Sequence, residues 1–224
     1  MRYGVLSDIH GNLPALAAVC EAMPPVDAYL CAGDVVGYNP WPGECIEWIR
    51  EKAVVTVRGN HDHAVATDGG DWFNEMGRAG VTYSRRELDR AELRWLDSLS
   101  THETVASGDV LLVHGHPDDP DRYTYPDSFS AAMLRENYRV VITGHTHIQG
   151  HREFEQGIVM NPGSVGQPRD GDPRAGFAVL ELDGDTGRPT VEENRVEYDI
   201  ERVVDAVADA GLPMRIGTRL RQGK

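Results

Sequence analysis

Cysteine is scarce in this sequence and forms no pattern of bridges or metal ligands. The three cysteines, Cys20, Cys31 and Cys45, are odd in number, and no C-x-x-C spacing joins any two of them. Each stands among apolar residues or beside a predicted element, so we interpret all three as small core residues in a reducing compartment. Neither a disulfide framework nor a thiolate zinc site is expected.

Long apolar runs are absent as well. No stretch approaches the roughly 20 apolar residues that a membrane-spanning helix needs. The first residues, from Met1 to Asp8, reach a carboxylate too soon for the apolar segment of a secretory signal. We therefore expect a cytoplasmic protein with no membrane partner.

Basic residues are also few relative to acidic ones. Lys and Arg number 22 against 36 Asp and Glu, which gives a formal net charge of −14, and only Lys52 and Lys224 are lysines. Stable binding to duplex nucleic acid depends on a basic face that releases counterions, so it is not expected here. A local basic or metal-rich cleft is still compatible with this composition.

What is present is the pattern of a globular α/β protein, which we interpret as a single domain over residues 1–224. Short, mostly β-branched runs predict strands at 3–7, 28–31, 54–57, 110–113, 140–143, 158–161, 175–182 and 190–198. Apolar residues at helical spacing predict helices at 13–23, 42–52, 85–99, 128–136 and 200–210. Residues 67–103 are predicted to be a partly helical insertion, serving as a cap or as a surface for a partner.

Polar clusters follow the early strands at their carboxyl ends, where open α/β sheets place their sites. Asp8-Ile9-His10 follows the first strand, and in an extended segment residues two apart point the same way, so this carboxylate and imidazole can share one ion. The later clusters are Gly33-Asp34, Arg58-Gly59-Asn60-His61-Asp62, His114-Gly115-His116 and Gly144-His145-Thr146-His147. Five such clusters in this order predict a metal site.

The order and spacing of these clusters resemble those of the calcineurin-like metallophosphoesterases over residues 1 to about 165. The segments Asn161-Pro162-Gly163-Ser164-Val165, Gln167-Pro168-Arg169 and Gly211-Leu212-Pro213 are similar to the compact prokaryotic branch, which includes phosphodiesterases of the YfcE type. The resemblance implies a four-layer αββα sandwich, with two mixed β-sheets flanked by helices. It also implies hydrolysis of a phosphate ester by a water that two divalent cations activate.

Carried over residue by residue, the resemblance assigns seven metal ligands. Those of the first cation are Asp8, His10 and His147, those of the second are Asn60, His114 and His145, and Asp34 bridges the two. Oxygen and imidazole ligands without thiolate favour manganese, with iron, nickel or zinc as alternatives. Two dications outweigh the charges of Asp8 and Asp34, so the site would attract a phosphate anion despite the acidic chain.

Other residues of the clusters are expected to act on the substrate. By resemblance, His61 is the general acid that protonates the leaving oxygen. Asp62 is expected to orient the loop or His61, with a solvated turn as the alternative. Arg58 resembles the phosphate-contacting arginine of the protein phosphatases, with a surface salt bridge as the alternative, and His116 is expected to touch the substrate.

The sequence departs from the protein phosphatases and dinucleoside tetraphosphatases after Gly33-Asp34, where Val35-Val36-Gly37 replaces their D-R-G motif. A small phosphodiester or nucleotide is therefore the predicted substrate, hydrolysed by a phosphodiesterase. Aromatic residues in loops after the metal-bearing strands are candidates to stack a base, or else to close hydrophobic edges: Tyr38, Trp41, Tyr123 and Tyr125. Alternative functions are a non-catalytic interaction scaffold and a single-strand nuclease working with a partner. The sequence also leaves open whether the protein forms a homo-oligomer.

Overall fold

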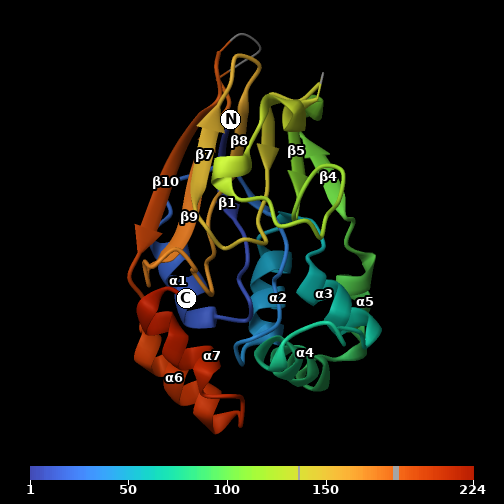
Figure 1. Cartoon of the computed structure of the whole chain (residues 1–224), viewed down its shortest axis with the longest axis vertical. Helices are drawn as coiled ribbons and strands as arrows, with labels where there is room; N and C mark the ends of the chain where they lie inside the picture. The colour runs from blue at the N-terminus through green and yellow to red at the C-terminus, as the bar shows by residue number, and fades with distance from the viewer. Residues whose placement is uncertain (136, 184–186) are drawn as a thin grey trace.

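Two mixed five-stranded sheets form the centre of the protein in the computed structural model, which describes residues 1–135, 137–183 and 187–224 (Figure 1). The first sheet has the order β10-β9-β1-β2-β3, with β1 (Arg2–Leu6), β2 (Ala28–Cys31), β3 (Val55–Thr56), β9 (Ala175–Glu181) and β10 (Thr190–Val196). Its strands β1, β2 and β3 are parallel, while β9 is antiparallel to both of its neighbours.

The second sheet has the order β4-β5-β6-β8-β7. Its strands are β4 (His102–Val105), β5 (Val110–Val113), β6 (Val140–Ile142), β7 (Gly150–Glu153) and β8 (Ile158–Asn161). Strands β5, β6 and β8 are parallel, and the edge strands β4 and β7 are antiparallel to their neighbours. The carboxyl ends of β1, β2 and β3 in the first sheet and of β5 and β6 in the second thus carry the loops in which the polar clusters lie.

The continuous apolar runs of the strands are buried on both faces because each sheet has a core on either side. In β5, Val110 and Leu112 point into the core between the sheets, whereas Leu111 and Val113 pack under the outer layer. Side chains alternate across a strand, so an unbroken apolar run supplies two cores at once.

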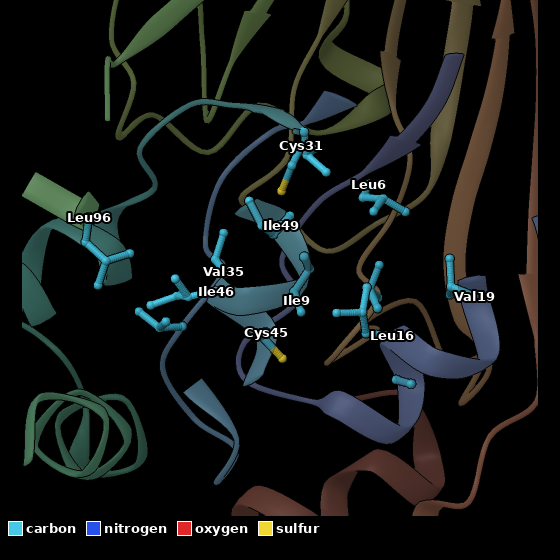
Figure 2. Packing of buried hydrophobic residues seen from close by; sticks show 14 of the residues in the cluster. Leu6, Ile9, Leu16, Val19, Cys31, Val35, Cys45, Ile46, Ile49 and Leu96 are labelled. Atoms are coloured by element: carbon cyan, nitrogen blue, oxygen red, sulfur yellow. The ribbon is translucent and has the colours of Figure 1, made fainter. Parts of the chain in front are cut away.

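Five helices share a core with the outer face of the first sheet: α1 (Leu13–Ala22), α2 (Pro42–Glu51), α3 (Asn60–Thr67), α4 (Glu75–Glu87) and α5 (Arg90–Ser98). At the carboxyl end, α6 (Ile200–Asp209) and α7 (Arg215–Thr218) pack in a separate cluster with Tyr38, below the sheets in Figure 1. Figure 2 shows Leu16 of α1, Ile46 of α2 and Leu96 of α5 gathered with Leu6 and Ile9 in the core that the five helices share with the sheet. Because Ile9 is buried between Asp8 and His10, the core anchors the loop that carries the first polar cluster.

The predicted helix at 85–99 is wrong as a single element. Helix α4 ends at Glu87 and α5 begins at Arg90, because Asp89 caps α5. The Asp89 carboxylate accepts the N–H groups of Ala91 at 2.6 Å and Glu92 at 2.8 Å, and Glu92 in turn accepts the N–H of Asp89 at 2.7 Å. This reciprocal capping box favours a new helix start over continuation of α4.

The predicted helix at 128–136 is also wrong. The chain makes two short 3-10 turns there, Pro126–Ser128 and Ala131–Leu134, and Glu136 lies outside the described residues. Phe129, Met133 and Leu134 still cover the outer face of the second sheet. These three apolar residues are thus buried, but the backbone of the segment is not the predicted helix.

The predicted sandwich of two mixed sheets with flanking helices is confirmed. Helix α3 and strands β4 and β7 were not predicted. Residues 67–103 are largely helical, and their role as an insertion stays a prediction. Within the described residues, no helix is long and apolar enough to cross a membrane.

Candidate metal centre

Seven side chains from both sheets meet where the loops after the parallel strands converge. We call them the floor: Asp8, His10, Asp34, Asn60, His114, His145 and His147. Their donor atoms form two groups around Asp34, and the first brings Asp8 Oδ1 within 3.3 Å of His147 Nε2, which is 3.2 Å from His10 Nε2. The first group therefore has the donor atoms of a compact cation site.

The second group lies on the other side of Asp34. His114 Nε2 is 3.1 Å from Asn60 Oδ1 and 3.1 Å from His145 Nδ1. Asp34 Oδ2 is 3.6 Å from His10 Nε2 and 3.4 Å from His114 Nε2, so one carboxylate oxygen stands between the two groups. The structure thus brings together all seven side chains that the sequence predicted as ligands, in the predicted grouping.

The histidines of the floor are oriented by main-chain carbonyls. Nδ1 of His10, His114 and His147 donates to the carbonyls of Val36, Ala32 and Gln167, at 3.1, 2.7 and 2.6 Å. Nε2 of His145 donates to the carbonyl of Asp121 at 3.1 Å. A carbonyl only accepts, so in each neutral ring the proton lies on the outer nitrogen and the inner nitrogen presents a lone pair.

Pairs of ring nitrogens about 3 Å apart in a buried site fit a bound cation. In the pair of His10 and His147, two lone pairs face each other and repel, and the repulsion is relieved when a cation lies between them. The chemistry of the donors, carboxylate, amide and imidazole without thiolate, is also that of a divalent transition-metal site. The residues present therefore fit divalent metal ions.

The electrostatics of the floor agree with this fit. Burial raises the pKa of Asp8 to about 7 and lowers the pKa values of His10 and His147 well below their ordinary value. Burial would lower the pKa of His114, but the carboxylate of Asp34 outweighs this effect and raises that pKa to about 10. His114 in turn holds the pKa of Asp34 below its ordinary value. A cation bound between these donors would displace the proton of His114, so we expect metal binding to release protons from the floor.

The backbone of the floor corrects one part of the sequence reasoning. Asp8 and His10 have φ of 52° and 51°, so they lie in the left-handed region and not in the extended segment that was predicted. Asp34, His145 and His147 share this conformation, with φ of 55°, 66° and 59°. Such residues cost roughly 1–3 kcal/mol each and cluster at functional sites.

Glycines let the floor loops approach each other closely. A Cβ on Gly59 would come within 2.0 Å of Asp34 Oδ1, and one on Gly144 within 2.0 Å of Ser7 Oγ. Neither position has room for a side chain, which explains glycine in these two clusters.

Asp62 is buried and holds the floor loops together from behind. Its carboxylate accepts the main-chain N–H groups of Asp34 at 2.8 Å, Gly59 at 3.0 Å and Val36 at 3.1 Å. The alternative of a solvated turn is therefore ruled out. Asp62 is also not among the described residues that line the cavity next to the floor. Its geometry is that of a positioning residue for the bridging Asp34.

His61 faces the cavity beside the floor. Its main-chain N–H donates to Asp34 Oδ1 at 2.9 Å, and its ring lies 4.8 Å from the ring of His10 and 4.3 Å from that of Phe73. Nδ1 is buried without a hydrogen-bond partner in the part of the chain that the structure describes. Burial lowers the pKa of His61 to about 4, so the ring is neutral near pH 7 in the metal-free protein.

Arg58 does not reach the site. Its guanidinium bonds the carbonyl of Asp97 at 3.4 Å and lies 4.0 Å from the Asp97 carboxylate, and it is not among the described residues that line the cavity. The predicted phosphate contact is therefore not supported, and the alternative of a surface ion pair fits. His116 is likewise absent from the described lining, because it turns toward the main-chain N–H of Asp118, which donates to it at 3.1 Å.

A cavity of about 590 Å³ opens above the floor, within the range of small-molecule sites. Eight of the described lining residues come from outside the metal clusters. Five of them we call the rim, Trp72, Phe73, Tyr123, Arg169 and Arg219, and the other three are Tyr38, Asn74 and Asp121. Tyr38 and Tyr123, which the sequence marked as stacking candidates, line the cavity, whereas Trp41 packs with the carboxyl-terminal helices. Tyr125 stacks on Tyr123, with ring centres 6.4 Å apart.

Sequence reasoning gave no role to four of the rim residues. Arg169 was noted only as part of the resemblance, and Trp72 and Phe73 lie in the predicted cap without a role of their own. For Arg169, the segment Gln167-Pro168-Arg169 was a sequence pattern that could have indicated a functional residue. No local pattern places Arg219 near the floor, because the contact depends on how the carboxyl-terminal helices fold back.

The sandwich with this cluster at its edge is the metallophosphoesterase fold, as comparison with known proteins shows. The metallophosphoesterase from Sphaerobacter thermophilus matches with a TM-score of 0.85 and 33% identity, covering 100% of both chains. An uncharacterized protein of Methanocaldococcus jannaschii is 33% identical over 243 residues, which cover 98% of this chain and 97% of the relative. Phosphodiesterase YfcE of Escherichia coli is 27% identical over 196 residues, covering 82% and 89%.

A model of the calcineurin-like phosphoesterase superfamily domain matches residues 1–185. The chain therefore belongs to the calcineurin-like phosphoesterase superfamily, and the predicted resemblance is confirmed.

Proposed function

We propose that this protein is a divalent-metal-dependent phosphodiesterase that hydrolyses a small phosphodiester or nucleotide. The observation that carries the proposal is the arrangement of the floor, in which Asp34 Oδ2 stands between two groups of inward-facing donors. The likeness to a relative named phosphodiesterase supports the choice of a diester.

Two cations would be held by the floor. Asp8, His10 and His147 would bind the first, Asn60, His114 and His145 the second, and Asp34 both. When bound, the cations polarise phosphoryl oxygens and lower the pKa of a water toward neutrality. Manganese is our first choice for both positions, because it suits a donor set of oxygen and imidazole without thiolate; iron, nickel and zinc fit the same donors.

His61 supplies a proton to the leaving oxygen in this proposal. It lies beside the floor and lines the cavity, so its ring can reach a substrate that the floor holds. Burial keeps its pKa at about 4. An anionic phosphate placed against the ring favours the protonated form and so opposes the effect of burial.

The size and walls of the cavity support a small substrate with an aromatic part. Phe73 lies against His61 with ring centres 4.3 Å apart, and Tyr123 lies against His145 at 4.0 Å. Trp72 is 66% exposed and contacts Phe73, so its face is open to a ligand at the mouth. A base stacked on such a ring gains about 1–3 kcal/mol.

The test is hydrolysis of bis-p-nitrophenyl phosphate by protein loaded with manganese. Wild type should hydrolyse it, and His61→Ala should lower kcat by roughly 10²- to 10⁴-fold while elemental analysis finds the metals retained. His63→Ala is the matched control, since His63 is exposed on the same helix and should keep the wild-type rate. Loss of metal together with activity in His61→Ala would contradict the division between floor and proton donor.

A further inference from the structure

Two arginines from distant segments line the same cavity as the floor. Arg169 follows Gln167-Pro168, after the loop of the last ligand, and Arg219 begins the 3-10 turn Arg219–Gln222 near the carboxyl end. Neither belongs to a metal cluster, and the proposed hydrolysis assigns neither of them a step.

Among the described residues, neither Arg169 nor Arg219 is paired with an Asp or Glu side chain, although neighbouring arginines are. Arg174, Arg195 and Arg221 nearby are ion-paired with Asp172, Asp170 and Glu201.

In contrast, the hydrogen bonds of Arg169 go to Gln167 Oε1 and the Tyr38 hydroxyl, and Arg219 Nε bonds the main-chain oxygen of Lys224. No Asp or Glu side chain of the described residues pairs with either guanidinium. In a chain with 36 acidic residues, this leaves two guanidiniums that line the cavity without an Asp or Glu partner among the described residues.

Arg169 is held in a fixed position next to the floor. Its Nη2 donates to Gln167 Oε1 at 2.7 Å and to the Tyr38 hydroxyl at 3.3 Å, and its guanidinium lies 5.8 Å from the centre of the Tyr38 ring. Gln167 is buried, and its carbonyl accepts the Nδ1 proton of the ligand His147 at 2.6 Å. The same residue thus orients a metal ligand and the arginine, so their spacing is fixed in the fold.

Arg219 is held by the docking of the carboxyl-terminal turn. Leu220 is buried with Tyr38 and Ile216, and the carbonyl of Gly223 accepts the N–H of Gly171 at 3.0 Å, two residues beyond Arg169. The Nη groups of Arg219 make no hydrogen bond to the described residues, so the end of its fork is available. Burial, followed by the nearby charge of Arg169, lowers the pKa of Arg219.

The two arginines reach the cavity from different parts of the sequence. Arg169 stands next to the floor through Gln167, whose carbonyl accepts a hydrogen bond from His147. Arg219 lies on the carboxyl-terminal turn, which docks on Gly171. Two neighbouring guanidiniums repel each other, and an anion bound between them removes that repulsion. A guanidinium fork suits the oxygens of a phosphate.

We propose that Arg169 and Arg219 form a second phosphate subsite, so that the substrate is a phosphodiester whose organic part carries a further phosphate group. This inference rests on the proposed phosphodiesterase function. The reacting diester lies on the floor, and the additional phosphate lies at the mouth of the cavity against the two arginines.

The experiment compares two dinucleotides that differ only in that group. Diadenylate with a 5′-phosphate and diadenylate without it are hydrolysed by the manganese-loaded protein, and kcat/KM is measured for each. We expect the phosphorylated dinucleotide to be preferred by roughly 10- to 100-fold, the range of one or two charge-assisted hydrogen bonds. Arg219→Gln should reduce this ratio at least about tenfold, and Arg219→Lys should retain part of it, because lysine keeps the charge without the fork.

Arg215→Gln is the matched control. Arg215 is exposed on α7, four residues from Arg219, and is not among the described residues that line the cavity. It should keep the wild-type ratio, and thermal unfolding of each variant checks that the carboxyl-terminal turn is still folded. Equal kcat/KM for the two dinucleotides in wild type, or an unchanged ratio in Arg219→Gln, would overturn the subsite while bis-p-nitrophenyl phosphate is still hydrolysed. Failure to hydrolyse all three compounds would overturn the phosphodiesterase function, and the subsite with it.

Discussion

The floor and the rim of the cavity are built in opposite ways. The side chains of Asp8, His10 and His114 are fully buried, and each is fixed by main-chain groups of loops that follow β-strands. At the rim, Trp72 is 66% exposed and Tyr123 54% exposed, and the residues come from segments outside the metal clusters. Rigid sheet edges thus hold the groups that would perform the chemistry, while surface segments hold those that would select the substrate.

The largest effect should come from the centre of the floor. Asp34→Asn removes the charge of the one carboxylate oxygen that stands between both groups of donors. We expect metal affinity to fall by more than about 100-fold, beyond the 10- to 100-fold typical of residues that only orient a ligand, and activity to fall with it. Isothermal titration with manganese measures the affinity. Asp97→Asn, the same change at an exposed helix position, is the control, and comparable loss there would show that the effect is unspecific.

An intermediate effect is expected at the rim. Trp72→Ala should cost about 1–3 kcal/mol in binding of a nucleotide substrate, seen as a higher KM with little change in kcat, because the ring contacts only the organic part. Steady-state kinetics with the phosphorylated diadenylate provides the measurement. Met214→Ala removes an exposed apolar side chain elsewhere and serves as the control. A fall in kcat at constant KM would place Trp72 with the chemistry and weaken the comparison.

The smallest effect should come from Arg58, which belongs to a metal cluster in sequence but to neither part of the cavity in space. Arg58→Gln should change kcat and KM by less than about twofold and stability by about 0–1 kcal/mol, since it loses only a surface ion pair. Kinetics with bis-p-nitrophenyl phosphate checks this outcome. A tenfold loss of kcat would return Arg58 to the role of a phosphate contact.

The floor could be predicted because its residues stand in short clusters directly after strands. Parallel strands end at a common edge, so the position of His114 after β5 and of His145 after β6 already implies that they are neighbours. The left-handed backbone of Asp8 and His10 could not be predicted in the same way. It is imposed by the main-chain bonds of these residues to Gly33 and Asp34, which belong to a different loop.

Other parts of the fold show where local patterns fail. The apolar spacing of Leu88, Leu93 and Leu96 runs on across a helix boundary, although Asp89 and Glu92 form a recognisable capping box. Residues 131–134 have good helix propensity, yet the turn ends at Arg135 with φ of 50°, so tertiary packing overrides propensity. Arg219 reaches the cavity only because the carboxyl-terminal turn docks beside Arg169, a contact between distant segments that no local pattern encodes.

The central claim is that Asp34 joins two cations in one site. Anomalous diffraction from crystals of the manganese-loaded protein tests it most directly. Our account predicts two ions per chain, one contacting Asp8, His10 and His147, the other contacting Asn60, His114 and His145, and both contacting Asp34. A single ion, or two ions of which one does not contact Asp34, would contradict it.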